Sequence, residues 1–320
     1  MSSTRPLPDF LIVGAPRCGT TFMWRYLRQH PQVYMPRDKE PTFFATDLDS
    51  GSYQDSLAFM RDPAEYADLF AAARPDQLTG EASTWYLYSR SAAANIRAAN
   101  PTARIIVHLR DPVEMLYSIH ERRLYTGSED LPSFEEALAA EADRRAGRRI
   151  PAQARNVSGL FYREVGRLGA QLERYLDEFG RDAVHVVVLE DLQADPARAY
   201  RETLAFLGLP EFEPDLAVVN SAAGRRSTTL HRLVRSAGAL PAVRRLVPQR
   251  LRTGTRRSLN RLNRRRTERA PLEPRIAAAL RRELQDDVVR LGQLLGRDFV
   301  DLWWSRPVDE PARRAEAPPG

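Results

Sequence analysis

Short apolar runs alternate with longer amphipathic stretches along most of the chain. Residues 10–13, 103–112 and 183–192 each contain a run of apolar residues that is short enough for a buried strand. Helical spacing of apolar positions follows or precedes each run, and the predicted helices cover residues 20–29, 111–124, 134–149, 166–180, 196–210 and 274–295. Strands that alternate with helices predict an α/β fold, in which helices flank both faces of a parallel sheet.

The length of the chain and the spacing of these elements predict a single catalytic domain. The 320 residues are enough for one large α/β domain with a sizeable core, and the sequence shows no internal repeat. We expect an N-terminal extension at 1–8, the domain itself at 9–304 with an insertion at about 227–270, and a disordered Pro-rich tail at 305–320.

The net charge of +6 is unevenly distributed. The stretch from Arg225 to Arg269 holds 15 arginines and a single acid, Glu268, so it carries +14 and leaves about −8 for the rest. Such a block can bind nucleic acid, an anionic membrane surface or an anionic substrate, and it can equally be a solvated face. It contains no Phe, Tyr or Trp, so stacking on bases, and with it nucleic-acid binding, is not expected.

The residue composition limits which kinds of site the chain can hold and where the protein can be located. Cys18 is the only cysteine and the five histidines have no metal-ligand spacing, so we expect no disulfide and no metal site. No stretch resembles a signal peptide or a membrane span, which favours the cytoplasm, either free or at the inner membrane surface. Lys39 is the only lysine beside 47 arginines, a bias that indicates a bacterial genome of high GC content.

The segment Gly14–Thr21, with the sequence GAPRCGTT, joins the first predicted strand to the first predicted helix. Backbone N–H groups in such a turn, together with the positive end of the helix, form an anion site. A nucleoside-triphosphate loop has lysine after its second glycine, but Thr20 stands there and Arg17 lies inside the loop. The loop therefore favours a ligand with a phosphate or phosphosulfate group over ATP.

This loop resembles the 5′-phosphosulfate loop of sulfotransferases that use 3′-phosphoadenosine 5′-phosphosulfate (PAPS). Their common form is Pro-Lys-x-Gly-Thr-Thr, and here it is Pro16–Thr21 with arginine in place of lysine. The resemblance implies a sulfotransferase-like P-loop fold, PAPS as co-substrate and no metal. It also implies that the donor is bound by Arg17, Cys18, Gly19, Thr20, Thr21 and Phe22.

A second segment, IVHLRDPVEMLYS, resembles the 3′-phosphate element of the same family. The resemblance assigns Arg110 and Ser118 to the 3′-phosphate, and a guanidinium with a hydroxyl suits that group chemically. Further along, VVNSAAGRRS resembles the family's stretch before the nucleotide loop, which adds Arg225 and Arg226 as candidates for the same phosphate.

The acceptor side of the site is expected in two further segments. KEPTFF, at 39–44, resembles the segment that carries the base in heparan-type and related bacterial enzymes, which makes Glu40 the base and places Lys39 beside it or beside the transferring group. GEASTWYLYS, at 80–89, resembles a segment with Pro at the place of Thr84. The resemblance places Glu81, Ser83 and Tyr86 near the acceptor or the phosphosulfate.

The sequence thus predicts a PAPS-dependent sulfotransferase that acts on a hydroxyl, or less readily an amine, of a carbohydrate or secondary metabolite. Arg17, Lys39 and Glu40 are its catalytic candidates. Two alternatives stay open at this point. One is a P-loop nucleotide kinase or phosphotransferase, and the other is a protein that binds anionic or membrane surfaces through its arginine-rich block. The sequence does not predict the oligomeric state.

Overall fold

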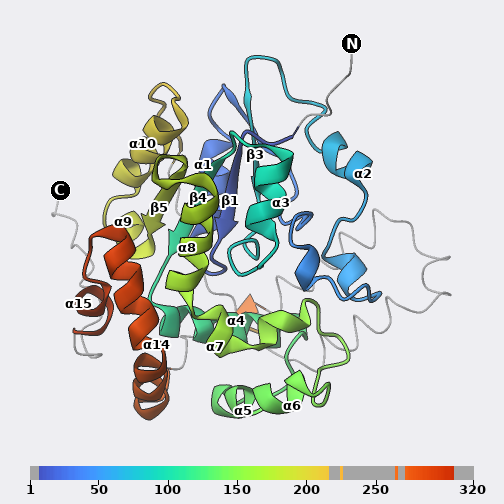
Figure 1. Cartoon of the computed structure of the whole chain (residues 1–320), viewed down its shortest axis with the longest axis vertical. Helices are drawn as coiled ribbons and strands as arrows, with labels where there is room; N and C mark the ends of the chain where they lie inside the picture. Colours follow the sequence, from blue (N-terminus) through green and yellow to red (C-terminus); the bar gives the residue numbers. More distant parts are fainter. Residues whose placement is uncertain (1–6, 216–223, 226–263, 266–270, 306–320) are drawn as a thin grey trace.

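The computed structural model describes residues 7–215, 224–225, 264–265 and 271–305 (Figure 1). Most of the predicted extension at 1–8, nearly all of the insertion at 227–270, Arg226 and the tail beyond Ser305 lie outside the described residues.

The core of the fold is a five-stranded parallel sheet with the strand order β2-β3-β1-β4-β5. The strands are β1 Phe10–Gly14, β2 Val33–Tyr34, β3 Leu78–Ala82, β4 Arg104–Leu109 and β5 Val184–Val188. Every residue of β1 is buried, as the continuous apolar run predicted for a strand in the middle of a parallel sheet. A separate two-stranded ladder pairs β6 Gly224–Arg225 with β7 Arg264–Arg265.

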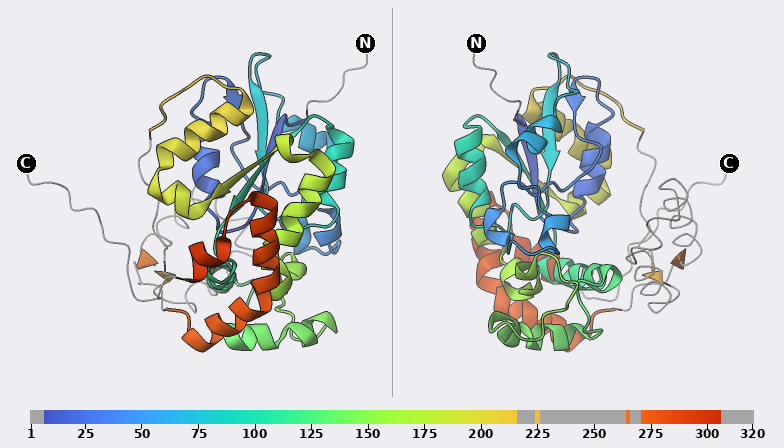
Figure 2. Two further views of the ribbon diagram at one scale, coloured as in Figure 1. Left: turned by 60° about the vertical axis from the view of Figure 1, so that its left-hand side comes forward. Right: turned by 90° about the vertical axis from the view of Figure 1, so that its right-hand side faces the viewer.

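Helices cover both faces of the sheet, so the predicted α/β architecture is confirmed (Figures 1 and 2). On one face lie α3 Ala92–Ala99, α8 Leu168–Phe179 and α14 Pro274–Leu295; on the other lie α1 Thr20–Leu27 and α10 Pro196–Leu207. The remaining helices are α2 Pro63–Asp68, α4 Pro112–Thr126, α5 Phe134–Ala139, α6 Glu141–Arg145, α7 Tyr162–Val165, α9 Leu189–Ala194 and α15 Phe299–Trp304. Short 3₁₀ turns cover Thr46–Leu48, Asp55–Leu57, Val157–Leu160 and Arg181–Ala183.

The start of α4 shows how local sequence fixes an element next to the site. Asp111 caps the helix by accepting a hydrogen bond of 2.8 Å from the Val113 amide, and Pro112 takes the first helical position. The indole of Trp304 on α15 donates at 3.3 Å to Asp111 Oδ1, the same oxygen that accepts from Val113. Burial raises the pKa of Asp111 to about 6. The C-terminal helices therefore support the segment that follows β4.

Several details of the predicted elements differ from the structure. The helix expected at 134–149 is two helices, α5 and α6, and the second ends at Arg145. The run at 183–192 was expected as one strand, but β5 ends at Val188 and the acidic LEDL stretch that follows belongs to α9. The strands β2 and β3 were not predicted as strands.

No helix among the described residues is both long enough and apolar enough to span a membrane.

Candidate functional site

The loop after β1 and the segment after β4 lie side by side at the carboxyl edge of the sheet. β1 and β4 are hydrogen-bonded neighbours, and the Ala15 amide donates to the carbonyl of His108 on β4 at 2.7 Å. In open parallel sheets this edge is where ligands bind, in the crevice outside the strand ends. Figure 1 shows α4 running beneath these ends, with the start of β1 at the opposite edge.

The backbone of the loop is fitted tightly to its neighbours. Gly14 has φ +147°, and a Cβ there would lie 2.6 Å from the carbonyl oxygen of Thr84, so only glycine fits. Gly19 has φ +86° where α1 begins, and its Cβ would press on Leu189 and Leu192 at 3.0 Å. The close packing leaves no room for side chains at these two positions, and the loop leads directly into the N-terminus of α1, where free amides can bind an anion.

Arg17, Arg110 and Ser118, three of the candidate donor-binding residues, lie near one another at one end of the loop. Arg17 Nε donates to Ser118 Oγ at 2.9 Å, across 101 residues of chain. Although Arg17 as a residue is exposed, desolvation of its guanidinium, followed by the charges of Arg122 and Arg110, lowers the pKa of Arg17. Arg110 itself contacts Glu114 at 3.4 Å. Three guanidinium groups beside a hydroxyl form a strong site for a doubly charged phosphate.

Arg122 is the member of this cluster that the sequence did not identify. It lies on α4, four residues after Ser118, and its guanidinium stacks over Tyr125 at 5.2 Å. Positions four residues apart share a helix face, so the spacing alone could have drawn attention to it.

Lys39 connects the loop to the proposed acceptor side. Its Nζ donates to the hydroxyls of Thr20 and Thr21 at 3.3 and 3.2 Å and lies 3.9 Å from Glu40 Oε1. Its side chain is 13% exposed and that of Glu40 37%. Desolvation lowers the pKa of Lys39, which the charge of Glu40 partly opposes. A carboxylate and a cation therefore stand directly beside the anion loop.

The segment after β3 presents a buried polar cluster. Glu81 is 1% exposed, and its Oε2 accepts hydrogen bonds of 2.9 Å from the hydroxyls of Tyr66 and Tyr86. Ser83 accepts from the Thr42 amide at 2.9 Å. Burial raises the pKa of Glu81 to about 7, and the nearby charge of Glu40 adds to this. The three predicted acceptor residues Glu81, Ser83 and Tyr86 thus lie together beneath the surface, with Glu81 held by tyrosines.

The remaining candidates are placed as follows. Cys18 is buried in the loop, and burial raises the pKa of its thiol to about 12, so it stays neutral and is not a nucleophile. Phe22 lies on α1 and packs edge-on against Tyr26 at 4.0 Å. Arg225 lies in β6, and Arg226 is among the residues that are not described. In the part of the chain that the structure describes, no three His, Cys, Asp or Glu side chains group into a metal site.

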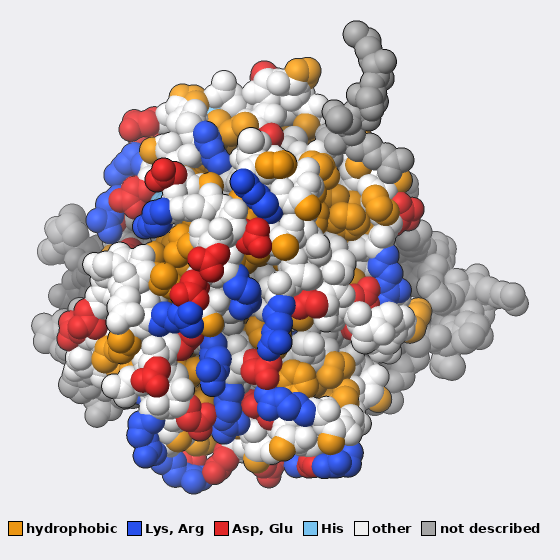
Figure 3. Space-filling model, viewed as in Figure 1, with side chains coloured by type: hydrophobic (Ala, Val, Ile, Leu, Met, Phe, Trp, Pro, Cys, Tyr) orange, Lys and Arg blue, Asp and Glu red, His pale blue; other side chains and the backbone are white. Residues whose placement is uncertain are grey.

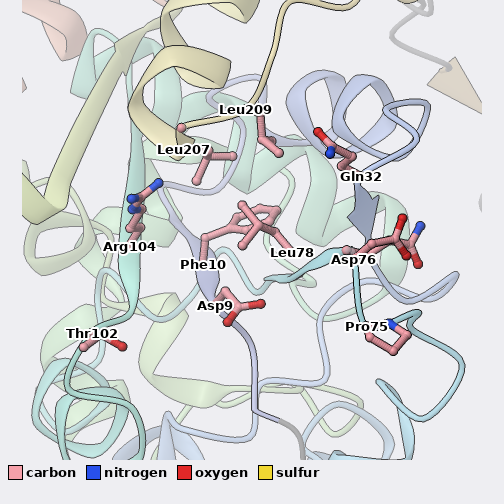
Figure 4. Close-up of a pocket in the computed structure, with 12 residues that line it drawn as sticks. Asp9, Phe10, Gln32, Pro75, Asp76, Leu78, Thr102, Arg104, Leu207 and Leu209 are labelled. Atoms are coloured by element: carbon pink, nitrogen blue, oxygen red, sulfur yellow. The ribbon is translucent and has the colours of Figure 1, made fainter.

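One cavity lies away from this crevice. It has a volume of about 540 Å³ and lies at the amino ends of the strands, between Asp9, Leu78, Arg104 and Leu209 (Figure 4). Because the loop and the Glu40 segment are at the carboxyl ends, this cavity takes no part in the chemistry considered below.

On the face shown in Figure 3, arginines and acidic side chains intermingle, and no broad patch of one sign is visible.

We expect Glu81→Gln to change how stability depends on pH. The folded pKa of about 7 exceeds the ordinary 4.5, so the stabilisation from protonated Glu81 is complete below about pH 4.5 and is lost as pH rises through 7. The difference of about 2.5 pKa units corresponds to roughly 3 kcal/mol. In urea unfolding, the wild type should lose that much relative to the glutamine variant between pH 4.5 and 8. Parallel stability curves for the two proteins would contradict the assignment.

Comparisons with known proteins agree with this geometry. The sulfotransferase family model matches residues 8–214. Mouse heparan sulfate glucosamine 3-O-sulfotransferase 3B1 is 30% identical over 214 residues, which are 67% of this chain and 49% of that protein. Human carbohydrate sulfotransferase 15 is 33% identical over 150 residues, 36% of this chain and 27% of that protein. The chain spans about half the length of the heparan sulfate 3-O-sulfotransferases it matches.

A sulfotransferase from Alicyclobacillus acidocaldarius has a similar solved structure, with a TM-score of 0.70 and 30% identity, covering 94% of this chain and 100% of that one. The comparisons favour neither a nucleotide kinase nor a protein that acts only through an anionic surface. With the family match over residues 8–214 and the parallel sheet in agreement, the chain belongs to the sulfotransferase family.

Proposed function

We propose that this enzyme transfers the sulfuryl group of PAPS to a hydroxyl of a carbohydrate or natural-product acceptor, with Glu40 as the base. The observation that carries the proposal is the position of Lys39, whose ammonium contacts both loop threonines and lies 3.9 Å from the Glu40 carboxylate. The arrangement places an anion loop, a cation and a base within one side-chain length of each other. In-line transfer of a sulfuryl group needs these three components together.

On the donor side, the amides of the loop and the hydroxyls of Thr20 and Thr21 would hold the 5′-phosphosulfate. Arg110 and Ser118 would hold the 3′-phosphate. Arg17, whose Nε donates to Ser118, would lie between the 5′- and 3′-phosphates. There it would stabilise the charge on the departing phosphate. The candidates Cys18, Gly19 and Phe22 would contribute the backbone and the wall of this loop, and Arg225 and Arg226 would add charge near the 3′-phosphate.

On the acceptor side, Glu40 would take the proton from the acceptor hydroxyl as its oxygen forms the new bond to sulfur. The bond between sulfur and the bridging phosphate oxygen breaks in the same displacement, and adenosine 3′,5′-bisphosphate leaves with the electron pair. Lys39 would lie against the transferring group and its developing charge. The names of the relatives support a carbohydrate acceptor, since two of them sulfate heparan sulfate glucosamine or carbohydrate.

The direct test is incubation with ³⁵S-labelled PAPS and a panel of acceptors. The panel holds heparan and chondroitin oligosaccharides, glycolipids and small natural-product alcohols. We expect label to be transferred to at least one class, and the protein to be retained on immobilised adenosine 3′,5′-bisphosphate. Turnover of ATP with magnesium and no retention on the bisphosphate would overturn the proposal and favour a phosphotransferase.

We expect Arg110→Ala to weaken binding of adenosine 3′,5′-bisphosphate by roughly 10- to 100-fold, because a charge-assisted hydrogen bond contributes about 1.5–3 kcal/mol. Binding of adenosine 5′-phosphosulfate, which has no 3′-phosphate, should hardly change. The variant therefore loses discrimination between the two nucleotides in isothermal titration calorimetry. Arg104→Ala is the matched control, since Arg104 begins the same strand at the opposite edge of the sheet. Equal weakening for both nucleotides would contradict the role of Arg110.

A further inference from the structure

The carboxylate of Glu40 is bound by a residue that none of the assigned roles includes. The Thr84 amide donates to Glu40 Oε2 at 3.2 Å, and the Thr84 hydroxyl lies 3.1 Å from Oε1 and 3.0 Å from Oε2. Thr84 is 5% exposed, so these contacts are shielded from water on its side. The two residues are 44 positions apart in the sequence.

The backbone of Glu40 is fixed to the same segment. Its amide donates to the carbonyl of Ala82 at 3.0 Å, and its φ is +69°, in the left-handed region that glutamate adopts only when its surroundings require it. The Thr42 hydroxyl donates to the carbonyl of Glu40 at 3.1 Å. The main chain of Glu40 is thus anchored to the last residue of β3, and its side chain to Thr84 just after that strand.

The hydrogen bonds leave Glu40 free to act. A hydroxyl has one hydrogen, so Thr84 donates at most two bonds at a time, one from its amide and one from its hydroxyl. An ionised carboxylate can accept about four, which leaves lone pairs for an acceptor hydroxyl. Donors directed at a carboxylate also stabilise its charged form, the form able to take a proton. The Lys39 ammonium adds a positive charge 3.9 Å from Glu40 Oε1.

We propose that Thr84 is the positioning residue for Glu40: through its amide and its hydroxyl it orients the carboxylate toward the acceptor. This inference rests on the proposed role of Glu40 as the base. The related segment pattern has proline at this place, and proline has neither an N–H nor a hydroxyl, so both donors are features of this chain.

Three substitutions of Thr84 separate the contribution of its amide from that of its hydroxyl. Thr84→Val keeps the shape and the amide but removes the hydroxyl, Thr84→Ser keeps both donors, and Thr84→Pro removes both. Thr203→Val is the matched control for loss of a buried threonine hydroxyl, since Thr203 is fully buried in α10 and donates to the carbonyl of Ala199 at 2.8 Å. Heparan sulfate oligosaccharide with PAPS is the activity probe. Protein labelled with [δ-¹³C]glutamate provides a readout that needs no turnover, with Glu40→Gln assigning the signal.

With Thr84→Val we expect kcat/KM to fall roughly three- to tenfold, since one hydrogen bond to a partly exposed charge is lost. The loss should appear in kcat with KM little changed, and the Glu40 carboxyl signal should move from its wild-type chemical shift. Thr84→Ser should restore the kinetic constants and the carboxyl signal to their wild-type values. Thr84→Pro should change both by more than Thr84→Val does, and Thr203→Val should change neither. Affinity for adenosine 3′,5′-bisphosphate should be unchanged throughout.

The outcomes distinguish this inference from the proposed function. If Glu40→Gln abolishes transfer but Thr84→Val leaves the carboxyl signal and the kinetic constants as in the wild type, Thr84 is not a positioning residue and Glu40 can still be the base. If Glu40→Gln retains full activity, the proposed base is wrong whatever Thr84 does. If the oligosaccharide is not sulfated, the carboxyl signal alone decides: an unchanged chemical shift in Thr84→Val overturns the inference, and a displaced shift that serine restores supports it.

Discussion

Glu40→Gln is expected to lower kcat by about 10²–10⁴-fold, the usual contribution of a positioned general base. Glutamine keeps the size of the side chain, and its amide oxygen can still accept from Thr84, so the loop and its surroundings should keep their arrangement. What the variant lacks is a group that can take the acceptor's proton. Because Glu40 contacts Thr84 and Lys39 rather than the loop itself, affinity for adenosine 3′,5′-bisphosphate should change little.

The measurement is steady-state transfer of ³⁵S to the acceptor identified in the panel, with bisphosphate affinity measured on the same preparations. Glu178→Gln, an exposed glutamate on α8, is the control for the substitution itself. A kcat within threefold of the wild type for Glu40→Gln would rule out Glu40 as the base. Equal losses in kcat and in bisphosphate affinity would instead indicate that the substitution had disturbed the donor loop.

The sequence predicted the strands and helices whose hydrophobic pattern is regular. β1 and β4 were found because they are almost wholly apolar, which central parallel strands must be. β3 was missed because its sequence, LTGEA, contains a buried glutamate and a glycine. Gly80 is there because a Cβ would lie 2.1 Å from the ring of Phe10, and Glu81 is tolerated because two tyrosines bind it. Tertiary contacts, not local preference, make this strand.

The candidate site was predictable where a local pattern carries it and not where distant segments meet. The loop at Gly14–Thr21 follows from a strand, two glycines and a helix start, all adjacent in the sequence. The link from Lys39 to the loop threonines and the bonds from Thr84 to Glu40 arise only because β3 pairs with β1, which brings the segments after both strands to one edge. No property of residues 39–44 alone shows which groups they contact.

The second large effect is expected on the free energy of unfolding. It concerns a buried ion pair whose two residues are not among the predicted site residues. Arg144 Nη2 lies 2.7 Å from Glu129 Oε1, and both side chains are 0% exposed. Glu129 Oε2 accepts from the Tyr162 hydroxyl at 2.9 Å, and Oε1 accepts from two backbone amides at 2.9 and 3.0 Å. Burial by itself would raise the pKa of Glu129, but the bonds from Arg144, the amides and Tyr162 outweigh it and lower that pKa.

Arg144→Met should therefore reduce the free energy of unfolding by about 3–5 kcal/mol at pH 7, because it leaves a buried carboxylate without its cation. The loss should shrink toward low pH, where protonation removes the uncompensated charge. The double variant Arg144→Met with Glu129→Leu should be more stable than the single variant, since no buried charge remains. Arg148→Met removes an exposed arginine paired with Asp143 and should cost less than about 1 kcal/mol. Urea unfolding of the four proteins measures these values, and a loss for Arg144→Met no larger than that for Arg148→Met would contradict a stabilising role of the buried pair.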